Sequence, residues 1–251
     1  MILNFDIPDI ERPPRDLLTA LSAEVSSAAA TSALYRLGIR DSHLRGLVSF
    51  SPGVKVVGPA LTLQFMPKRE DVYGQTEYDD VERQLHRHVL YKAQPGDVVV
   101  VDARGHLGSG VFGEMMLTYF KAKGGVGVVV DGCIRDFPRV KELGLGLWLR
   151  GVTPNFHTQT DLFPFAVNVP IACGERLVLP GDIIIADDDG AVVVPRQLAE
   201  AVLADAREHA EWEAFARERL AAGGDLRVYY PLTEAARTEY EAWRQGRRQQ
   251  G

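Results

Sequence analysis

The stretch GDVVVVDARGHLGSGVFGEMMLTYFKAKGGVGVVVDGCIRDFPRVKELGLGLWLRG, residues 96–151, decides the fold class. Three short apolar runs alternate in it with two segments of helical character. The runs are 96–102, 126–132 and 147–151, and the helical segments are 114–124 and 134–144. Short runs of this kind are typical of strands buried on both faces. Their alternation with helices predicts parallel strands joined by crossover helices.

The sequence on either side of this stretch extends the prediction. An Ala/Leu-rich segment predicts a helix over 17–37 that is capped by Gly38, and an alternating pattern predicts a strand over 54–65. Residues 78–93 look helical and polar. After residue 151, short strands with turn signals 8–12 residues apart predict a mostly antiparallel layer. From residue 196 onward the pattern is helical and very polar.

We therefore expect one α/β domain with extensions at both ends. The predicted divisions are an N-terminal arm over 1–16, the α/β domain over 17–221 and a helical tail over 222–251. A chain of 251 residues is long enough to bury a core without disulfides. We find no internal repeat and no low-complexity segment.

Composition and charge narrow the class of protein. The net charge of −6 argues against a protein whose main role is binding nucleic acid. Only two cysteines are present, Cys133 and Cys173, which favours a reducing compartment. The N-terminal residues lack an apolar run of signal-peptide length, and no stretch approaches 18 uninterrupted apolar residues. We expect a cytoplasmic protein with no membrane partner.

Two segments that follow neighbouring strands carry the candidate chemistry. The pattern predicts a glycine-rich loop over 103–113 that ends in Gly113-Glu114 at a predicted helix start, and the second strand leads into Arg135-Asp136. Ligand sites in parallel sheets collect beyond the carboxyl ends of strands, so both segments are expected to face one crevice. Each motif alone also has a purely structural explanation. The glycine-rich stretch could be a tight turn, and Arg135-Asp136 could be a charge pair at a helix start.

The residue types suit a small anionic substrate and a hard metal ion. The backbone amides near Met115 and Met116 begin a helix and suit a carboxylate. Arg135 supplies a cation with a bidentate fork, and Asp136 supplies an oxygen ligand for Mg²⁺ or Mn²⁺. Glu114 is the candidate for proton handling or for holding a water.

Taken in order, GDVVVVD, GSGVFGEMM, GGVGVVVDGCIRD, LWLRGVTP and VLPGDIIIADDDGAVVVP resemble the family of regulator of ribonuclease activity A (RraA) and 4-hydroxy-4-methyl-2-oxoglutarate aldolase. The resemblance covers roughly residues 25–220. It implies a swivelling β/β/α fold that assembles as homotrimers or homohexamers. It also implies a class II pyruvate aldolase, a lyase with oxaloacetate decarboxylase side activity.

The resemblance assigns roles to individual residues. Asp136 would hold the divalent metal, mainly through water, and Arg135 would bind the substrate oxygen next to the cleaved bond. The amides from Gly113 to Met116 would hold the pyruvate carboxylate. Glu114, aspartate in many members, would hold the water that takes a proton from the distant hydroxyl. His106 is a further candidate for substrate contact.

Other readings stay open. Regulator members of the family bind a ribonuclease or helicase without catalysis, and a metal-dependent lyase or hydratase on 2-oxo sugar acids would use the same enolate chemistry. His157 could line the pocket, and an acid among Glu208, Glu211 and Glu213 could serve a neighbouring subunit's site. The spacing of His86 and His88 argues against a zinc site. Asp187–Asp189 are interpreted as a turn.

Overall fold

The computed structural model describes residues 7–69, 71, 81–157 and 160–248. Its chain separates into two compact units, Met1–Val202 and Leu203–Gly251, and the boundary falls inside a long helix. The sequence, by contrast, predicts that the C-terminal tail begins at residue 222. The expected division into an arm, a domain and a tail therefore stays a prediction.

The first unit is built on a mixed sheet that has eight strands in the described residues. The order along the sheet is β1-β5-β4-β3-β2-β9-β10, and β6 also pairs with β2. The strands are β1 (Val48–Ser49), β2 (Val56–Pro67), β3 (Val98–Gly110), β4 (Gly127–Ile134), β5 (Gly146–Val152), β6 (Leu162–Val167), β9 (Ile183–Asp187) and β10 (Gly190–Val194). β7 (Ile171–Cys173) and β8 (Arg176–Val178) form a separate antiparallel pair.

Short helices connect and cover these strands. Those of the first unit are α1 (Arg15–Glu24), α2 (Ser27–Arg36), η2 (Val81–Arg83), α3 (Leu85–Tyr91), α4 (Glu114–Ala122), α5 (Phe137–Val140), η3 (Lys141–Leu143) and η5 (Arg196–Leu198). α6 (Ala199–Ala221) contains the boundary between the units, and α7 (Leu226–Tyr229) and α8 (Glu234–Arg248) follow it.

The predicted parallel core is confirmed. β2 pairs with β3, β3 with β4 and β4 with β5, all in parallel. The predicted antiparallel strands are also present, but β9 and β6 both pair with the long strand β2 and so continue the same sheet. β2 is long enough to pair with β9 near its start and with β3 and β6 farther along.

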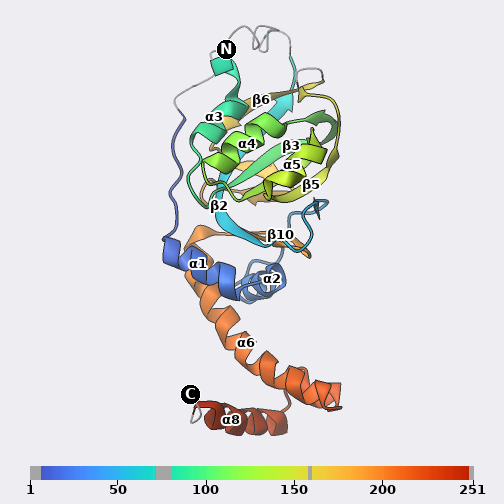
Figure 1. Ribbon diagram of the computed structural model, residues 1–251. Helices are drawn as coiled ribbons and strands as arrows, with labels where there is room; N and C mark the ends of the chain where they lie inside the picture. Colours follow the sequence, from blue (N-terminus) through green and yellow to red (C-terminus); the bar gives the residue numbers. More distant parts are fainter. Residues whose placement is uncertain (1–6, 70, 72–80, 158–159, 249–251) are drawn as a thin grey trace. The chain divides into compact units, whose positions relative to one another are not determined.

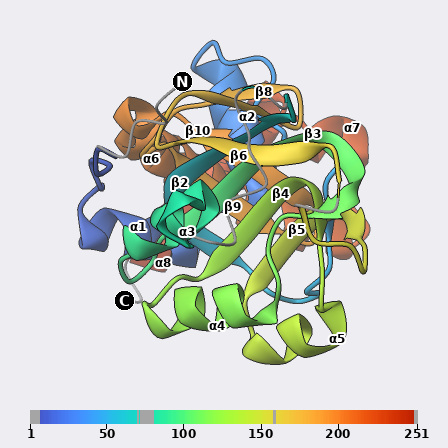
Figure 2. The same ribbon diagram turned by 90° about the horizontal axis from the view of Figure 1, so that it is seen from above.

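Apolar side chains fill both faces of the sheet. One core lies beneath α3, α4 and α5, which Figure 1 shows along the same face. It combines β-branched residues of β3 and β4 with Leu85, Leu117 and Phe120 from the helices. The opposite core includes Trp148 and side chains of β7 to β10, and Figure 2 shows β9 and β10 beyond β2. This burial on both faces explains the continuous valine runs.

The prediction of one helix over 17–37 is wrong. The segment forms α1 and α2, which meet at an angle of 107°. The break falls at Val25 and Ser26, where the Ser26 hydroxyl accepts a hydrogen bond from the Ala29 N–H at 3.1 Å and so caps the second helix. None of the described helices is by itself long and apolar enough to cross a membrane.

Two ion pairs tie distant segments to the sheet. Arg12 donates to Asp97 at 2.9 Å, and the Asp97 side chain is fully buried at the start of the central strands. On β4, Asp131 pairs with Arg150 of β5 and accepts a bond from the Gly174 N–H at 3.0 Å. Both carboxylates are buried and paired with partly exposed arginines, which compensates the cost of burying their charge.

Candidate active site

A small pocket lies where β3 and β4 end and α4 and α5 begin. Its volume is about 210 Å³, below the range of about 300–1,000 Å³ that drug-sized ligands occupy. Its described lining consists of Gln84, His86, Arg87, Gly110, Val111, Gly113, Met115, Met116, Arg135, Asp136, Phe156 and His157. A pocket of this size suits a small acid.

Arg135 and Asp136 stand together at one side of this pocket. Asp136 has φ 56°, in the left-handed region, where the chain turns from β4 into α5. This turn leaves Nε of Arg135 at 3.4 Å from Oδ2 of Asp136. The Arg135 guanidinium also lies over the Phe156 ring, 5.6 Å from its centroid. The aromatic contact and the carboxylate together orient this cation.

The segment between β3 and α4 runs beside the end of β4. The Val111 N–H donates to Cys133 O at 3.0 Å, and the Arg135 N–H donates to Phe112 O at 2.9 Å. β3 continues through most of the glycine-rich stretch, up to Gly110, with two register shifts against β4. The prediction of a loop over 103–113 was therefore wrong for most of its length, although the irregular backbone does carry the chain to the site.

Gly113 makes close packing at this point possible. A Cβ at this residue would lie 2.6 Å from Oδ2 of Asp136 and 2.9 Å from Nε of Arg135. Gly110 is equally restricted, because a Cβ there would lie 2.6 Å from the Asn155 carbonyl oxygen and 2.9 Å from Cβ of Arg135. These glycines are required for space, which explains two of the four glycines in the stretch 103–113.

The first turn of α4 faces the same pocket. The Leu117 N–H donates to Gly113 O at 3.2 Å. The N–H groups of Met115 and Met116 lie before this hydrogen bond, in the first turn of the helix. The Glu114 N–H donates to Oδ2 of Asp136 at 3.3 Å. Both methionines line the pocket. Backbone donors at a helix start, next to an arginine, form an environment suited to a carboxylate.

The two remaining predicted site residues lie apart from this lining. The Glu114 carboxylate is 3.5 Å from the Arg139 guanidinium. His106 accepts a hydrogen bond from the Gly108 N–H at 3.2 Å, and its Nε2 is 3.9 Å from Asp161. Neither side chain is among the described residues that line the pocket. Gly113, Met115, Met116, Arg135 and Asp136 are brought together there.

A second side of the pocket was not predicted as a group. It includes Gln84, His86 and Arg87 from the start of α3, with His157 beside them. Arg87 donates through Nε to the Gln84 side-chain oxygen at 2.7 Å. The His86 and His157 rings are in edge contact, with centroids 4.3 Å apart. Of this side, the sequence singled out only His157 as a residue that could line the pocket.

The donor set fits a metal held by one carboxylate and water. The described residues contain no group of three or more His, Cys, Asp or Glu side chains placed to bind a metal ion. Mg²⁺ commonly keeps several waters and uses one or two carboxylates together with substrate oxygens. The Asp136 side chain is 42% exposed, so water can reach it. Among the described lining residues, Asp136 is therefore the carboxylate that can anchor a hydrated cation.

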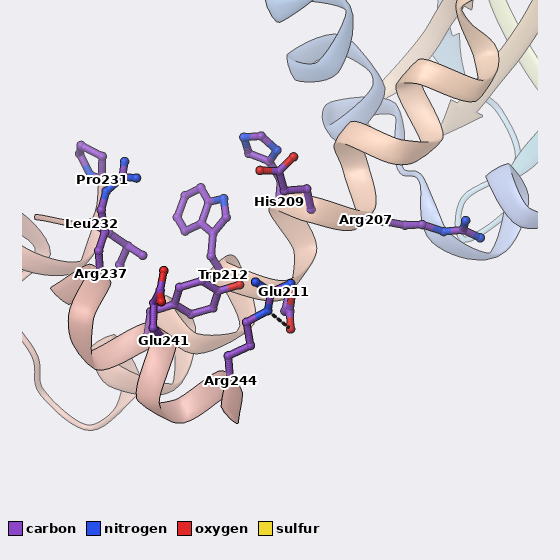
Figure 3. A pocket seen from close by; sticks show the side chains of 11 residues that line it. Arg207, His209, Glu211, Trp212, Pro231, Leu232, Arg237, Glu241 and Arg244 are labelled. Carbon is purple, nitrogen blue, oxygen red and sulfur yellow. Dashed lines mark hydrogen bonds and ion pairs between the residues drawn. The ribbon is translucent and has the colours of Figure 1, made fainter. Parts of the chain in front are cut away.

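A larger cavity, of about 690 Å³, lies within the C-terminal unit. Figure 3 shows Trp212 on α6 facing Pro231, Leu232 and α8, with Arg244 bonded to Glu211. That bond spans 3.1 Å. The lining mixes acids, arginines and aromatic rings. We place the candidate site in the smaller pocket because it combines a cation, a carboxylate and the first turn of a helix.

Comparison with known proteins identifies relatives. The family model described as RraA-like, Aldolase/RraA, matches residues 22–193. A Halalkalibacterium halodurans protein named "Putative 4-hydroxy-4-methyl-2-oxoglutarate aldolase" is 39% identical over 130 residues, which are 52% of this chain and 60% of that protein. An uncharacterized Methanocaldococcus jannaschii protein is 34% identical over 130 residues, 52% of this chain and 62% of its own length. The matches thus span less than two thirds of both relatives.

Solved structures agree with this fold. The crystal structure of Streptomyces coelicolor RraAS2, described as an unusual member of the RNase ES inhibitor RraA protein family, has a TM-score of 0.75 and 49% identity, and covers 82% of this chain and 98% of that one. An uncharacterized protein from Pseudomonas syringae pv. tomato has a TM-score of 0.72 and 28% identity, with coverage of 87% and 98%.

Proposed function

This chain belongs to the RraA-like family, Aldolase/RraA, and from that premise we propose that it is a divalent-metal-dependent class II aldolase. It would cleave a 4-hydroxy-2-oxo acid to pyruvate and decarboxylate oxaloacetate as a side activity. The observation that carries the proposal is the shared pocket of Arg135, Asp136 and the first turn of α4. The aldolase name of a relative that is 39% identical supports the same reaction class.

The substrate would bind through its 2-oxo acid end. The N–H groups at the start of α4, at Met115 and Met116, would hold the carboxylate, because the positive end of a helix stabilises an anion. Arg135, oriented by Asp136 and Phe156, would donate to the 2-oxo oxygen. Negative charge develops on that oxygen in the transition state, so a fixed cation there lowers the barrier.

Bond cleavage follows from this placement. The C4 hydroxyl loses its proton, the C3–C4 bond breaks, and its electron pair becomes the enolate of pyruvate, which is then protonated at C3. A cation anchored at Asp136, Mg²⁺ or Mn²⁺, would supply Lewis-acid stabilisation of the charged oxygen. Oxaloacetate would lose CO₂ to give the same enolate, which accounts for the proposed side activity.

Glu114 is proposed to handle the hydroxyl proton through a bridging water. Its backbone N–H holds Asp136, and its carboxylate lies 3.5 Å from Arg139. A glutamate is one methylene longer than the aspartate found in many family members, which changes the distance that the water must span. His106 stays a proposed substrate contact, reached only if the segment around it moves toward the pocket.

The reaction is tested by following pyruvate release with lactate dehydrogenase. Purified protein is given 4-hydroxy-4-methyl-2-oxoglutarate or oxaloacetate with Mg²⁺, Mn²⁺ or EDTA. Arg135→Lys keeps the charge but loses the bidentate fork, so we expect kcat/KM to decrease about 100-fold. Arg227→Lys, an exposed arginine of the C-terminal unit, is the matched control. Absence of pyruvate release under every metal condition would count against the aldolase.

A second function is favoured by the 49% identity to RraAS2, whose family is described as inhibiting RNase ES. As a regulator, the chain would bind a ribonuclease, and its net charge of −6 suits a basic partner. Inhibition of an RNase E-type enzyme that is unchanged in an Asp136→Asn variant would support it. If neither reaction occurs, pyruvate release from 2-oxo sugar acids tests the lyase or hydratase alternative.

We also propose a cytoplasmic location and assembly as a homotrimer or homohexamer. Both cysteines are free and buried, which agrees with a reducing compartment. The assembly rests on the family resemblance alone. Light scattering of the purified protein measures it.

A further inference from the structure

His86 is a buried polar residue that the proposed chemistry does not use. It lies on α3 and is 3% exposed. Its Nδ1 has no hydrogen-bond partner within the described residues. Buried polar atoms in native proteins are nearly always paired, so an exception calls for an explanation. The ring belongs to the lining of the pocket that contains Arg135 and Asp136.

The surroundings hold this ring in place and keep it neutral. The His157 ring packs on it edge-on, with centroids 4.3 Å apart, and the Phe65 centroid is 6.5 Å away. Burial lowers the pKa of His86 well below its ordinary value, and electrostatic repulsion from the neighbouring basic side chains His157, Arg87 and His88 adds to that effect. A neutral imidazole has one donor and one acceptor nitrogen, which suits an uncharged hydroxyl group.

The position along the substrate follows from the other side of the pocket. If Arg135 and the start of α4 hold the 2-oxo acid end, His86, which lines the same pocket from α3, is available to contact another part of the molecule. We propose that His86 binds the C4 hydroxyl of a 4-hydroxy-2-oxo acid and determines the preference for such substrates over oxaloacetate. This inference rests on the proposed function.

The two reactions of the proposed enzyme provide an internal comparison. Retro-aldol cleavage requires a hydrogen-bond partner for the C4 hydroxyl, whereas oxaloacetate has no such group. His86→Phe and His86→Asn should therefore lower kcat/KM for 4-hydroxy-4-methyl-2-oxoglutarate about tenfold relative to kcat/KM for oxaloacetate. Because both rates come from the same molecules, partial unfolding does not change their ratio. His88→Asn is the matched control, since His88 lies on the same helix outside the described lining.

Binding is measured separately from turnover by NMR of the imidazole signals, with Mg²⁺ present. The probe is 2,4-dihydroxyglutarate, which lacks the 2-oxo group and cannot be cleaved, and 2-hydroxyglutarate is the matched ligand without the C4 hydroxyl. We expect the His86 signal, assigned from its loss in His86→Asn, to shift only with the first ligand. The His88 signal should shift with neither.

The outcomes separate the two claims. A ligand-specific shift of His86 without any pyruvate release would overturn the aldolase and keep the hydroxyl contact. Pyruvate release with an unchanged rate ratio and no shift would overturn the contact and keep the aldolase. Neither release nor shift would overturn both.

Discussion

Nε of Arg135 and Oδ2 of Asp136 lie 3.4 Å apart, and the missing side chain of Gly113 leaves the space in which they meet. A Cβ at Gly113 would come within 2.6 Å of the carboxylate oxygen and within 2.9 Å of Nε. The geometry of the candidate site therefore depends on a residue that has no functional group.

Gly113→Ala should displace one or both of these side chains. The Gly113 φ is −119°, which alanine adopts readily, so the effect is steric and local. A displacement of about 1 Å in a catalytic group can lower the rate about 100-fold, and we expect a loss of that size in kcat/KM for pyruvate release.

Gly246→Ala, in α8 of the C-terminal unit, is the matched control, because a Cβ there would have no heavy atom from another part of the chain within 4 Å. Wild-type turnover in Gly113→Ala, with an unchanged melting temperature, would mean that the relative position of Arg135 and Asp136 is not required.

The central topology could be predicted from the sequence because buried parallel strands have a simple pattern. Continuous valine runs such as Val98–Val101 and Val128–Val130 need no partner information to be recognised as strands buried on both faces. The break between α1 and α2 could not be predicted in this way. Val25 and Ser26 are tolerated within helices, and the interactions that end α1 there involve the sheet, since Ser27 bonds to Asp187.

Stability should depend on pH through His86. Because the folded chain binds a proton at His86 less readily than the unfolded chain does, the free energy of unfolding should decrease as the pH falls below the ordinary value of 6.5. In His86→Phe, this decrease between about pH 7.5 and about pH 5.5 should be smaller than in the wild type. Urea denaturation at both pH values measures it.

The control for the pH measurement is Leu177→Phe, which changes an exposed side chain without adding or removing a titratable group and should keep the wild-type slope. Burial raises the pKa of Asp102 and of Asp182, and these groups favour the folded state as the pH falls. The contribution of Asp102 and Asp182 to the pH dependence of stability is opposite in sign to that of His86. It is the same in all variants, so it cancels when their slopes are compared. An equal slope in His86→Phe and wild type would show that His86 keeps its ordinary pKa.

The Asp131–Arg150 pair should contribute to stability. The Asp131 side chain is 8% exposed, and its second oxygen accepts the Gly174 N–H at 3.0 Å. Asp131→Asn leaves Arg150 without its charged partner, so we expect the free energy of unfolding to fall by about 3 kcal/mol. Asp225→Asn removes an exposed pair with Arg227 and should change little. Similar urea midpoints for both variants would contradict this prediction.

The second side of the pocket could not be derived from sequence for a physical reason. Residues 85, 86, 89 and 90 are buried on α3, so His86 occupies an otherwise apolar helix face. A histidine on an apolar helix face can be recognised in the sequence, and it could have marked His86 as a candidate residue. The partner ring, His157, lies 71 positions later in the chain, ahead of β6, and β6 packs beside α3 in the folded chain. Arg135 and Asp136, by contrast, follow a recognisable strand directly.

The most direct test of the central claim is pyruvate release from 4-hydroxy-4-methyl-2-oxoglutarate as a function of Mg²⁺ concentration, in the wild type and in Asp136→Asn. Asp189→Asn, an exposed carboxylate in the turn before β10, is the control. We expect EDTA to abolish wild-type activity, and we expect Asp136→Asn to lose at least about 100-fold in rate at every metal concentration. Wild-type rates in Asp136→Asn, or activity that persists in EDTA, would contradict a metal-dependent aldolase at this site.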